Sequence, residues 1–127
     1  MQSIKVAWSI DDDAEIGHII RLMLKAMGFE ARSFLHPREA VDLMVQGSAP
    51  DLIVLDMNMP GVTGIDVLEF IRSRERWDHI PIVILSVESA DEMVERAMSL
   101  GADGYVFKPM TMDELEEAIE KAKIKRQ

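Results

Sequence analysis

The chain has 127 residues, which is long enough for one domain with a single hydrophobic core and too short for two. Hydrophobic residues make up 48% and charged residues 29%, as in folded globular proteins, and the lack of cysteine excludes disulfides and thiolate metal sites. The formal charge of −9 disfavours nucleic acids and anionic membranes as direct partners, because both repel an acidic surface.

Short apolar runs alternate with amphipathic patterns about five times, which is typical of a parallel sheet flanked by helices. In chain order, the predicted strands are Ile4–Ile10, Glu30–Phe34, Asp51–Asp56, Pro81–Ser86 and Gly104–Phe107. The predicted helices are 14–27, 37–47, 64–74, 89–101 and one that starts at 111. The sequence therefore predicts an α/β fold of the (βα)5 type, doubly wound around one sheet.

Local signals mark several helix ends. Gly28 stops the first helix, and Pro37 occupies the first position of the second, where its missing N–H does no harm. Ser89 and Thr111 each precede an acidic residue three positions further on. We therefore predict a capping box at the start of both of the last two helices.

No repeat, low-complexity tract or internal boundary divides the chain, so we expect one domain over residues 1–127. Its folded core is expected at about 4–122, and the basic, polar residues 123–127 are expected to be a helix end, a tail or the start of a linker. No apolar stretch approaches the ~20 residues that span a bilayer. The first residues also lack the pattern of a signal peptide, so we expect a cytoplasmic protein.

Three carboxylates follow predicted strands, at the edge where open α/β sheets carry their chemistry. Asp11 and Asp12 come after the first strand, and Asp56 ends the third, directly before a turn sequence. Such carboxylates repel one another unless a cation lies between them, and oxygen ligands suit Mg²⁺. The alternative is that the acidic run only caps the next helix, a role that we do expect for Asp13. The combination with Asp56 favours the metal site.

Two more side chains end predicted strands at this edge. Lys108 follows the fifth strand and precedes Pro109, which keeps the lysine backbone extended or in a turn, so that its ammonium can reach an anion. Ser86 ends the fourth strand with a hydroxyl that can donate to a phosphoryl oxygen. Each alone would be interpreted as an ordinary surface lysine or strand end. Together with the carboxylates they indicate a phosphoryl-accepting metal site.

Five short segments in chain order carry this pattern across nearly the whole sequence. They are Ile10-Asp11-Asp12-Asp13, Leu55-Asp56-Met57-Asn58-Met59-Pro60-Gly61, Ile84-Leu85-Ser86, Gly101-Ala102 and Tyr105-Val106-Phe107-Lys108-Pro109. Each is weak singly, but the ordered set resembles the response-regulator receiver domain of two-component signalling. The resemblance implies a flavodoxin-like fold of three αβα layers with five parallel strands in the order 2-1-3-4-5.

The resemblance also implies the chemistry of the site. Asp56 would accept a phosphoryl group from a phosphohistidine on a sensor histidine kinase or a phosphotransfer protein. The cofactor would be Mg²⁺, with Mn²⁺ as a substitute, bound by Asp12 and Asp56, by Asp11 through water, and by the backbone carbonyl of Asn58. Only autocatalytic phosphotransfer and autodephosphorylation are expected, so the chain is not predicted to be an enzyme in the usual sense.

A switch is implied as well. Lys108 and Ser86 would hold the phosphoryl oxygens, and Tyr105 would be an aromatic switch residue coupled to Ser86. The change would alter the face made by the fourth helix, the last strand and the last helix, which would bind an effector or a second copy as a homodimer. The Lys108–Pro109 bond is expected to be cis.

Three positions are expected to tune the lifetime of the phosphorylated state: Asn58, Val87 and Glu88. The position of Val87 is commonly small in this family, so the stiffer, bulkier valine is predicted to slow phosphotransfer or hydrolysis. The family often has threonine in place of Ser86, and serine keeps the necessary hydroxyl.

Two other functions remain open from the sequence. One is a small phosphatase or phosphotransferase that acts on metabolites through an aspartyl phosphate, although no second Asp follows Asp56 at a two-residue spacing. The other is an interaction module that keeps the fold without being phosphorylated. The sequence does not identify the cognate kinase, the output or the oligomeric state.

Overall fold

The computed structural model describes residues 5–126 and contains five parallel strands, five α-helices and one short 3₁₀ helix. The strands are β1 (Val6–Ile10), β2 (Glu30–Phe34), β3 (Leu52–Asp56), β4 (Ile82–Ser86) and β5 (Gly104–Phe107). The helices are α1 (Ala14–Ala26), α2 (Pro37–Val45), α3 (Gly64–Arg72), η1 (Glu75–Trp77), α4 (Asp91–Ser99) and α5 (Met112–Lys125).

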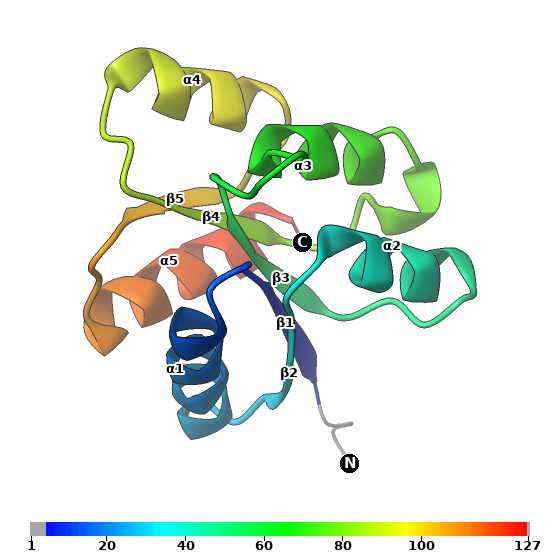
Figure 1. Ribbon diagram of the computed structural model, residues 1–127, viewed down its shortest axis with the longest axis horizontal. Helices are drawn as coiled ribbons and strands as arrows, with labels where there is room; N and C mark the ends of the chain where they lie inside the picture. Colours follow the sequence, from blue (N-terminus) through cyan, green and yellow to red (C-terminus); the bar gives the residue numbers. More distant parts are fainter. Residues whose placement is uncertain (1–4, 127) are drawn as a thin grey trace.

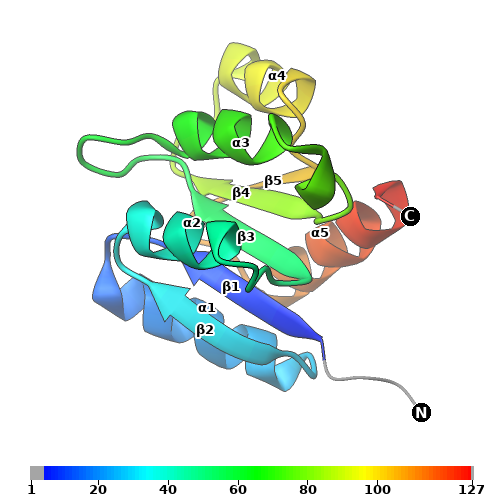
Figure 2. The same cartoon turned by 90° about the vertical axis from the view of Figure 1, so that its right-hand side faces the viewer.

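The strands form one sheet in the order β2-β1-β3-β4-β5, and every neighbouring pair is parallel. Helices α1 and α5 cover one face of the sheet and α2, α3 and α4 cover the other, so the molecule has three layers (Figures 1 and 2). The predicted fold class and strand order are confirmed. Because all strands run in the same direction, the loops after their C-terminal ends gather at one edge, here called the carboxyl edge; the opposite edge is the amino edge.

Two hydrophobic clusters fill the spaces between the layers. One cluster joins the sheet to α2, α3 and α4 and includes Trp8 and Ile84; the other joins it to α1 and α5 and includes Leu24 and Val54. Every residue of β3 and β4 is buried, as expected for central strands covered on both faces. The chain therefore delivers Asp56 and Ser86, the last residues of these two strands, from a rigid support.

Two predicted helix ends differ from the structure. No side chain caps α4, whose N-cap is Ala90, so the capping box predicted at Ser89 is wrong. At Thr111 the capping box is present in both directions, as predicted. Helix α5 continues to Lys125, past residue 122 where the folded core was expected to end. Ile4, predicted as the start of the first strand, lies outside the described residues, as does Gln127.

A buried ion cluster closes the amino edge. The Asp103 carboxylate, which has no exposed surface, accepts from Arg72 Nη2 at 2.9 Å and from Arg126 Nε at 2.7 Å. It also accepts from the Ile82 N–H at 2.9 Å. Arg72 additionally donates to the carbonyl of Gly101 at 2.9 Å. Residue 126 is thus tied to the start of β5, which explains why the folded part extends beyond the predicted limit.

Candidate metal centre at the carboxyl edge

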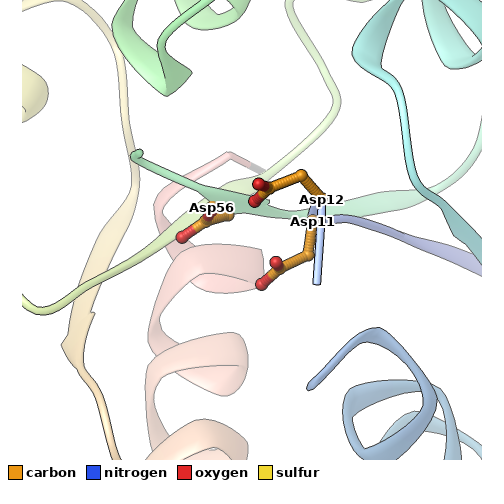
Figure 3. Close-up of side chains that lie close together, drawn as sticks. All are labelled: Asp11, Asp12 and Asp56. Carbon is orange, nitrogen blue, oxygen red and sulfur yellow. The ribbon is translucent and has the colours of Figure 1, made fainter. Parts of the chain in front are cut away.

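The three predicted carboxylates lie together at the carboxyl edge (Figure 3). Asp11 and Asp12 directly follow β1, and Asp56 ends the adjacent strand β3, with Ile10 and Leu55 in register between these strands. One oxygen from each carboxylate can be chosen so that all three atoms lie within 4.8 Å of one another. The register of two neighbouring strands therefore brings together residues that are 44 positions or more apart in the sequence.

The three acids have unequal environments. Asp11 and Asp56 are only 3% and 5% exposed, whereas Asp12 is exposed to solvent. Burial raises the pKa of Asp56 above its ordinary value, and the charges of Asp11 and Asp12 raise it further, while a hydrogen bond from Lys108 opposes the rise. The site thus holds more negative charge than it neutralises, and a further cation would be stabilised there.

Lys108 supplies the one positive charge that contacts this cluster in the described chain. Its Nζ donates to Asp56 Oδ1 at 2.7 Å and to Asp11 Oδ2 at 3.0 Å. Burial alone would lower the pKa of Lys108, but the hydrogen bonds to Asp56 and Asp11 raise it above its usual value. The lysine therefore remains an ammonium. The peptide bond that follows it is cis, as predicted.

Asp13 has the capping role that the sequence suggested for it. Its Oδ1 accepts from the N–H groups of Glu15 at 2.9 Å and Ile16 at 3.2 Å, which caps α1. Asp11 instead accepts from the Asp13 N–H at 2.9 Å and from Lys108. Capping thus accounts for one acid of the run, and the other two remain available at the cluster.

Ser86 and Tyr105 are connected through the backbone of Glu88. The Ser86 Oγ accepts from the Glu88 N–H at 2.9 Å, and the Tyr105 hydroxyl donates to the Glu88 carbonyl at 2.9 Å. Val87, between them in sequence, is 68% exposed and lines a cavity of about 320 Å³ together with Lys108. The predicted positions Ser86, Val87 and Glu88 therefore form one continuous segment that begins at the carboxyl edge.

Gly64 has a role at the site that the sequence did not reveal, because it was identified only as a helix start. A Cβ at this position would lie 2.6 Å from the Asp56 carbonyl oxygen and 2.8 Å from the Met57 Cα. Both are backbone atoms, so any larger residue would force the main chain of β3 and the following loop to shift. The Gly64 N–H donates to the Met57 carbonyl at 2.7 Å. A glycine is therefore needed for α3 to approach the end of β3 this closely. The sequence feature that could have indicated this role is a glycine eight residues after Asp56.

The donor set fits a hard divalent cation. All three side chains offer carboxylate oxygens, the ligands that Mg²⁺ and Mn²⁺ share, and exposed Asp12 leaves the cluster open to water. Asn58, whose carbonyl was predicted as a further ligand, lies two residues after Asp56 on the exposed loop. Its part in binding stays a prediction.

Residues 8–120 match the family described as the response regulator receiver domain. The chain belongs to this family. The match covers nearly all of the described sequence, including the carboxylates, Ser86, Tyr105 and Lys108. The predicted family is therefore confirmed, and the domain is one of two-component signalling.

Similar proteins include both short and long members of the receiver family. The chemotaxis protein CheY of Pseudomonas aeruginosa is 35% identical over 112 residues, which cover 88% of this chain and 90% of that protein. The phosphate regulon transcriptional regulatory protein PhoB of Rhizobium meliloti is 34% identical over 106 residues, 84% of this receiver domain but only 46% of PhoB.

A solved structure supports the same assignment. The response regulator receiver domain protein of Clostridium thermocellum superposes with a TM-score of 0.85 at 27% identity, covering 97% of each chain. A CheY4 structure from Vibrio cholerae has the same TM-score at 24% identity, which supports the fold. The receiver fold is thus shown by sequence and by structure.

Proposed function

We propose that Asp56 accepts a phosphoryl group from a phosphohistidine on a sensor histidine kinase or a phosphotransfer protein. The observation that carries this proposal is the contact of a buried carboxylate, Asp56, with Lys108 at 2.7 Å inside a cluster of three acids. Phosphoryl transfer needs an in-line nucleophile and positive charge around the transferred oxygens. The cluster offers the first and holds part of the second.

The reaction balances without a further reactant. A carboxylate oxygen of Asp56 forms a bond to phosphorus as the bond from phosphorus to the histidine nitrogen breaks, and that nitrogen keeps the electron pair. Lys108 moves from its Asp56 oxygen to a phosphoryl oxygen, and the Ser86 hydroxyl donates to another. Asp11, Asp12, Asp56 and the Asn58 carbonyl would hold Mg²⁺ or Mn²⁺, which when bound neutralises charge on the phosphoryl oxygens.

The switch follows from the segment that connects Ser86 to Tyr105. When Ser86 turns toward a phosphoryl oxygen, its Oγ loses the Glu88 N–H, and the backbone of Glu88 is free to shift. The Tyr105 hydroxyl, which donates to the Glu88 carbonyl, moves with it. Tyr105 lies on β5 between α4 and α5, so the α4–β5–α5 face changes and binds an effector or a second copy differently.

The proposed setting is the cytoplasm, where histidine kinases present their phosphohistidine. In the described part of the chain, no helix is both long and apolar enough to cross a membrane. The whole chain, residues 1–127, is proposed to act as one receiver domain.

The test is incubation with acetyl phosphate and Mg²⁺, followed by intact mass measurement. We expect the mass of one phosphoryl group on the wild type and on Asp13→Asn, whose side chain still caps α1, and none on Asp56→Asn. A phosphorylated Asp56→Asn variant would disprove the assignment of the acceptor. Turnover of many small phosphate esters would instead support the phosphatase alternative, and an unmodified wild type would support the interaction module.

Val87 gives a second, finer test. It is exposed and lines a cavity with Lys108, which supports the proposal that its branched side chain hinders an incoming phosphoryl donor. We propose that Val87→Ala accelerates phosphorylation or hydrolysis, with Asn58 and Glu88 also setting the lifetime. Equal rates for Val87→Ala and the wild type in phosphorylation and decay assays would remove the proposed role of Val87.

A further inference from the structure

Strand β2 has one free edge in the described structure. This strand is at one end of the sheet and pairs only with β1 among the described residues (Figure 2). The Glu30 N–H donates to the Lys5 carbonyl, and the Phe34 carbonyl accepts from the Asp11 N–H, so the even-numbered residues bond toward β1. In a parallel ladder the alternate residues, Ala31 and Ser33, then point their N–H and C=O groups outward.

Helix α1 forms a wall beside this edge and leaves a groove. The groove, here called the β2-edge groove, has a volume of about 450 Å³ and is lined by Ala14, Gly17, His18, Arg21, Ala31 and Ser33. The small side chains at 14 and 17 leave the outward backbone groups accessible. A Cβ on Gly17 would already lie 3.7 Å from the Ser33 Cβ, so a larger residue there would fill the groove.

Cationic side chains flank the edge on both faces of the sheet. On the α1 side, Arg21 Nη2 lies 2.9 Å from His18 Nδ1, and both side chains line the groove. On the α2 side, the Arg32 guanidinium stacks 4.7 Å from the centre of the Phe34 ring. Within residues 5–126 neither arginine forms an ion pair, although the chain carries a net charge of −9.

Two acids near the groove limit where a ligand can lie. Asp11 lines its inner end, but the Asp11 carboxylate already accepts from Lys108. Glu30 is exposed at the start of β2. An acidic side chain would therefore be favoured along the central part of β2, beside Arg21 and Arg32, and disfavoured next to Glu30.

We propose that the β2-edge groove binds an extended, acidic segment of a partner protein, which adds to the sheet as a sixth strand. The outward groups of Ala31 and Ser33 supply main-chain hydrogen bonds, and the two arginines, on opposite faces of the sheet, select for carboxylates on adjacent residues. A second copy of this chain is a poorer occupant, because the two-fold pairing of Ala31 with Ser33 places Arg32 directly opposite Arg32. The proposal does not use Asp56 and is independent of the proposed phosphorylation.

The probe is the acetylated, amidated peptide Thr-Val-Glu-Glu-Val-Thr, whose adjacent glutamates point to opposite faces of a strand, with Thr-Val-Lys-Lys-Val-Thr as its matched control. NMR titration at low salt is expected to show saturable shifts for β2 and α1 with the acidic peptide only. Hydrogen exchange at the Ala31 and Ser33 amides is expected to slow in proportion to the bound fraction. Asp56→Asn is expected to bind the peptide equally well.

Substitutions separate the contribution of the arginine charges from that of the main-chain hydrogen bonds. The double variant Arg21→Gln, Arg32→Gln is expected to weaken binding roughly three- to tenfold, and Arg38→Gln on α2 to leave it unchanged. Ser33→Pro removes an outward N–H without removing a bond to β1, and it is expected to abolish the slowed exchange. If that variant fails to fold, Gly17→Leu fills the groove and replaces a glycine of α1 by a residue of higher helix propensity.

Several results would overturn the proposal. These are equal shifts with both peptides, shifts confined to other elements, or binding that survives both Gly17→Leu and the double arginine variant. Light scattering that shows a dimer, together with concentration-dependent protection of Ala31 and Ser33 without peptide, would assign the edge to a second copy instead.

Discussion

At the amino edge of the sheet a single buried carboxylate, Asp103, faces two guanidinium groups, whereas at the carboxyl edge three carboxylates share the ammonium of Lys108. Strand β5 connects the two clusters, since Asp103 precedes it and Lys108 follows it. Both clusters are ion pairs in a mostly buried setting. The amino edge has an excess of positive charge, whereas the carboxyl edge has an excess of negative charge, which suits a divalent cation.

The buried side chains of the amino-edge cluster have all their polar atoms in hydrogen bonds within the described residues. Asp103 accepts from two arginines and a backbone N–H, and none of the buried polar side-chain atoms in residues 5–126 lacks a partner. Burial lowers the pKa of Arg72, and the neighbouring Arg126 lowers it further, while Asp103 opposes this change. Such a cluster fixes the ends of α3, β5 and α5 relative to one another and offers nothing to a ligand.

The largest effect on stability is expected from removing Asp103 from the amino-edge cluster. Asp103→Ala leaves two arginines and the Ile82 N–H without their shared acceptor, so we expect a loss of about 3–5 kcal/mol in the free energy of unfolding. Urea denaturation measures it. Asp42 is an exposed residue of α2 outside the ion pairs of the described chain, and Asp42→Ala should change the same quantity by less than about 0.5 kcal/mol. A similar loss in both variants would mean that the cluster does not stabilise the fold.

A smaller loss is expected when only one arginine is removed. Arg126→Ala deletes the bond to Asp103 and those to the carbonyls of Gly101 and Asp78, while Arg72 remains. We expect a loss of about 1.5–3 kcal/mol and faster hydrogen exchange in the last turn of α5. The exposed pair Lys121–Glu117 provides the contrast, since Lys121→Ala should cost less than about 1 kcal/mol.

The sequence predicted the carboxyl edge better than the amino edge, for a physical reason. Strand ends in a parallel sheet meet at one edge, so Asp11, Asp56 and Lys108 could be grouped from strand positions alone. Asp103 and its arginines belong to a strand start and two helix ends, and no comparable rule brings these together. Only the folded chain shows that Arg72 and Asp103 meet across 31 positions.

Capping shows the same limit at short range. Ser89 and Thr111 carry the same local pattern, yet only Thr111 caps its helix, with Oγ1 accepting from the Glu114 N–H. Helix α4 starts one residue later than the pattern requires, at Asp91, which leaves Ala90 as N-cap. A local pattern does not fix the start of a helix to better than one or two residues.

Adding Mg²⁺ should stabilise the folded protein by binding at the carboxyl edge. A cation that binds only the folded state at ten times its Kd adds about 1.4 kcal/mol to the free energy of unfolding. We expect this gain for the wild type in thermal or urea denaturation, and a smaller one for Asp12→Asn at the same concentration. Asp103→Asn, at the other edge, should keep the gain, because distant sites act additively. A full gain in Asp12→Asn would remove that side chain from the metal site.

The smallest effect concerns Asp56, the proposed acceptor, and unlike the two substitutions at the amino edge it is a gain in stability. Burial and neighbouring acids raise the pKa of Asp56, so the folded state holds this proton more tightly than the unfolded chain. The contribution of Asp56 to stability therefore increases as the pH falls through its folded pKa, and it is lost as the pH rises. Asp56→Asn supplies a neutral side chain of the same shape, and we expect it to stabilise the metal-free protein at neutral pH by about 1 kcal/mol.

Urea denaturation without divalent ions, at neutral and mildly acidic pH, should show that the gain from Asp56→Asn becomes smaller in acid. If Asp56→Asn is instead less stable at neutral pH, the ion pair with Lys108 outweighs the repulsion, and the carboxyl edge is held together without a metal as the amino edge is.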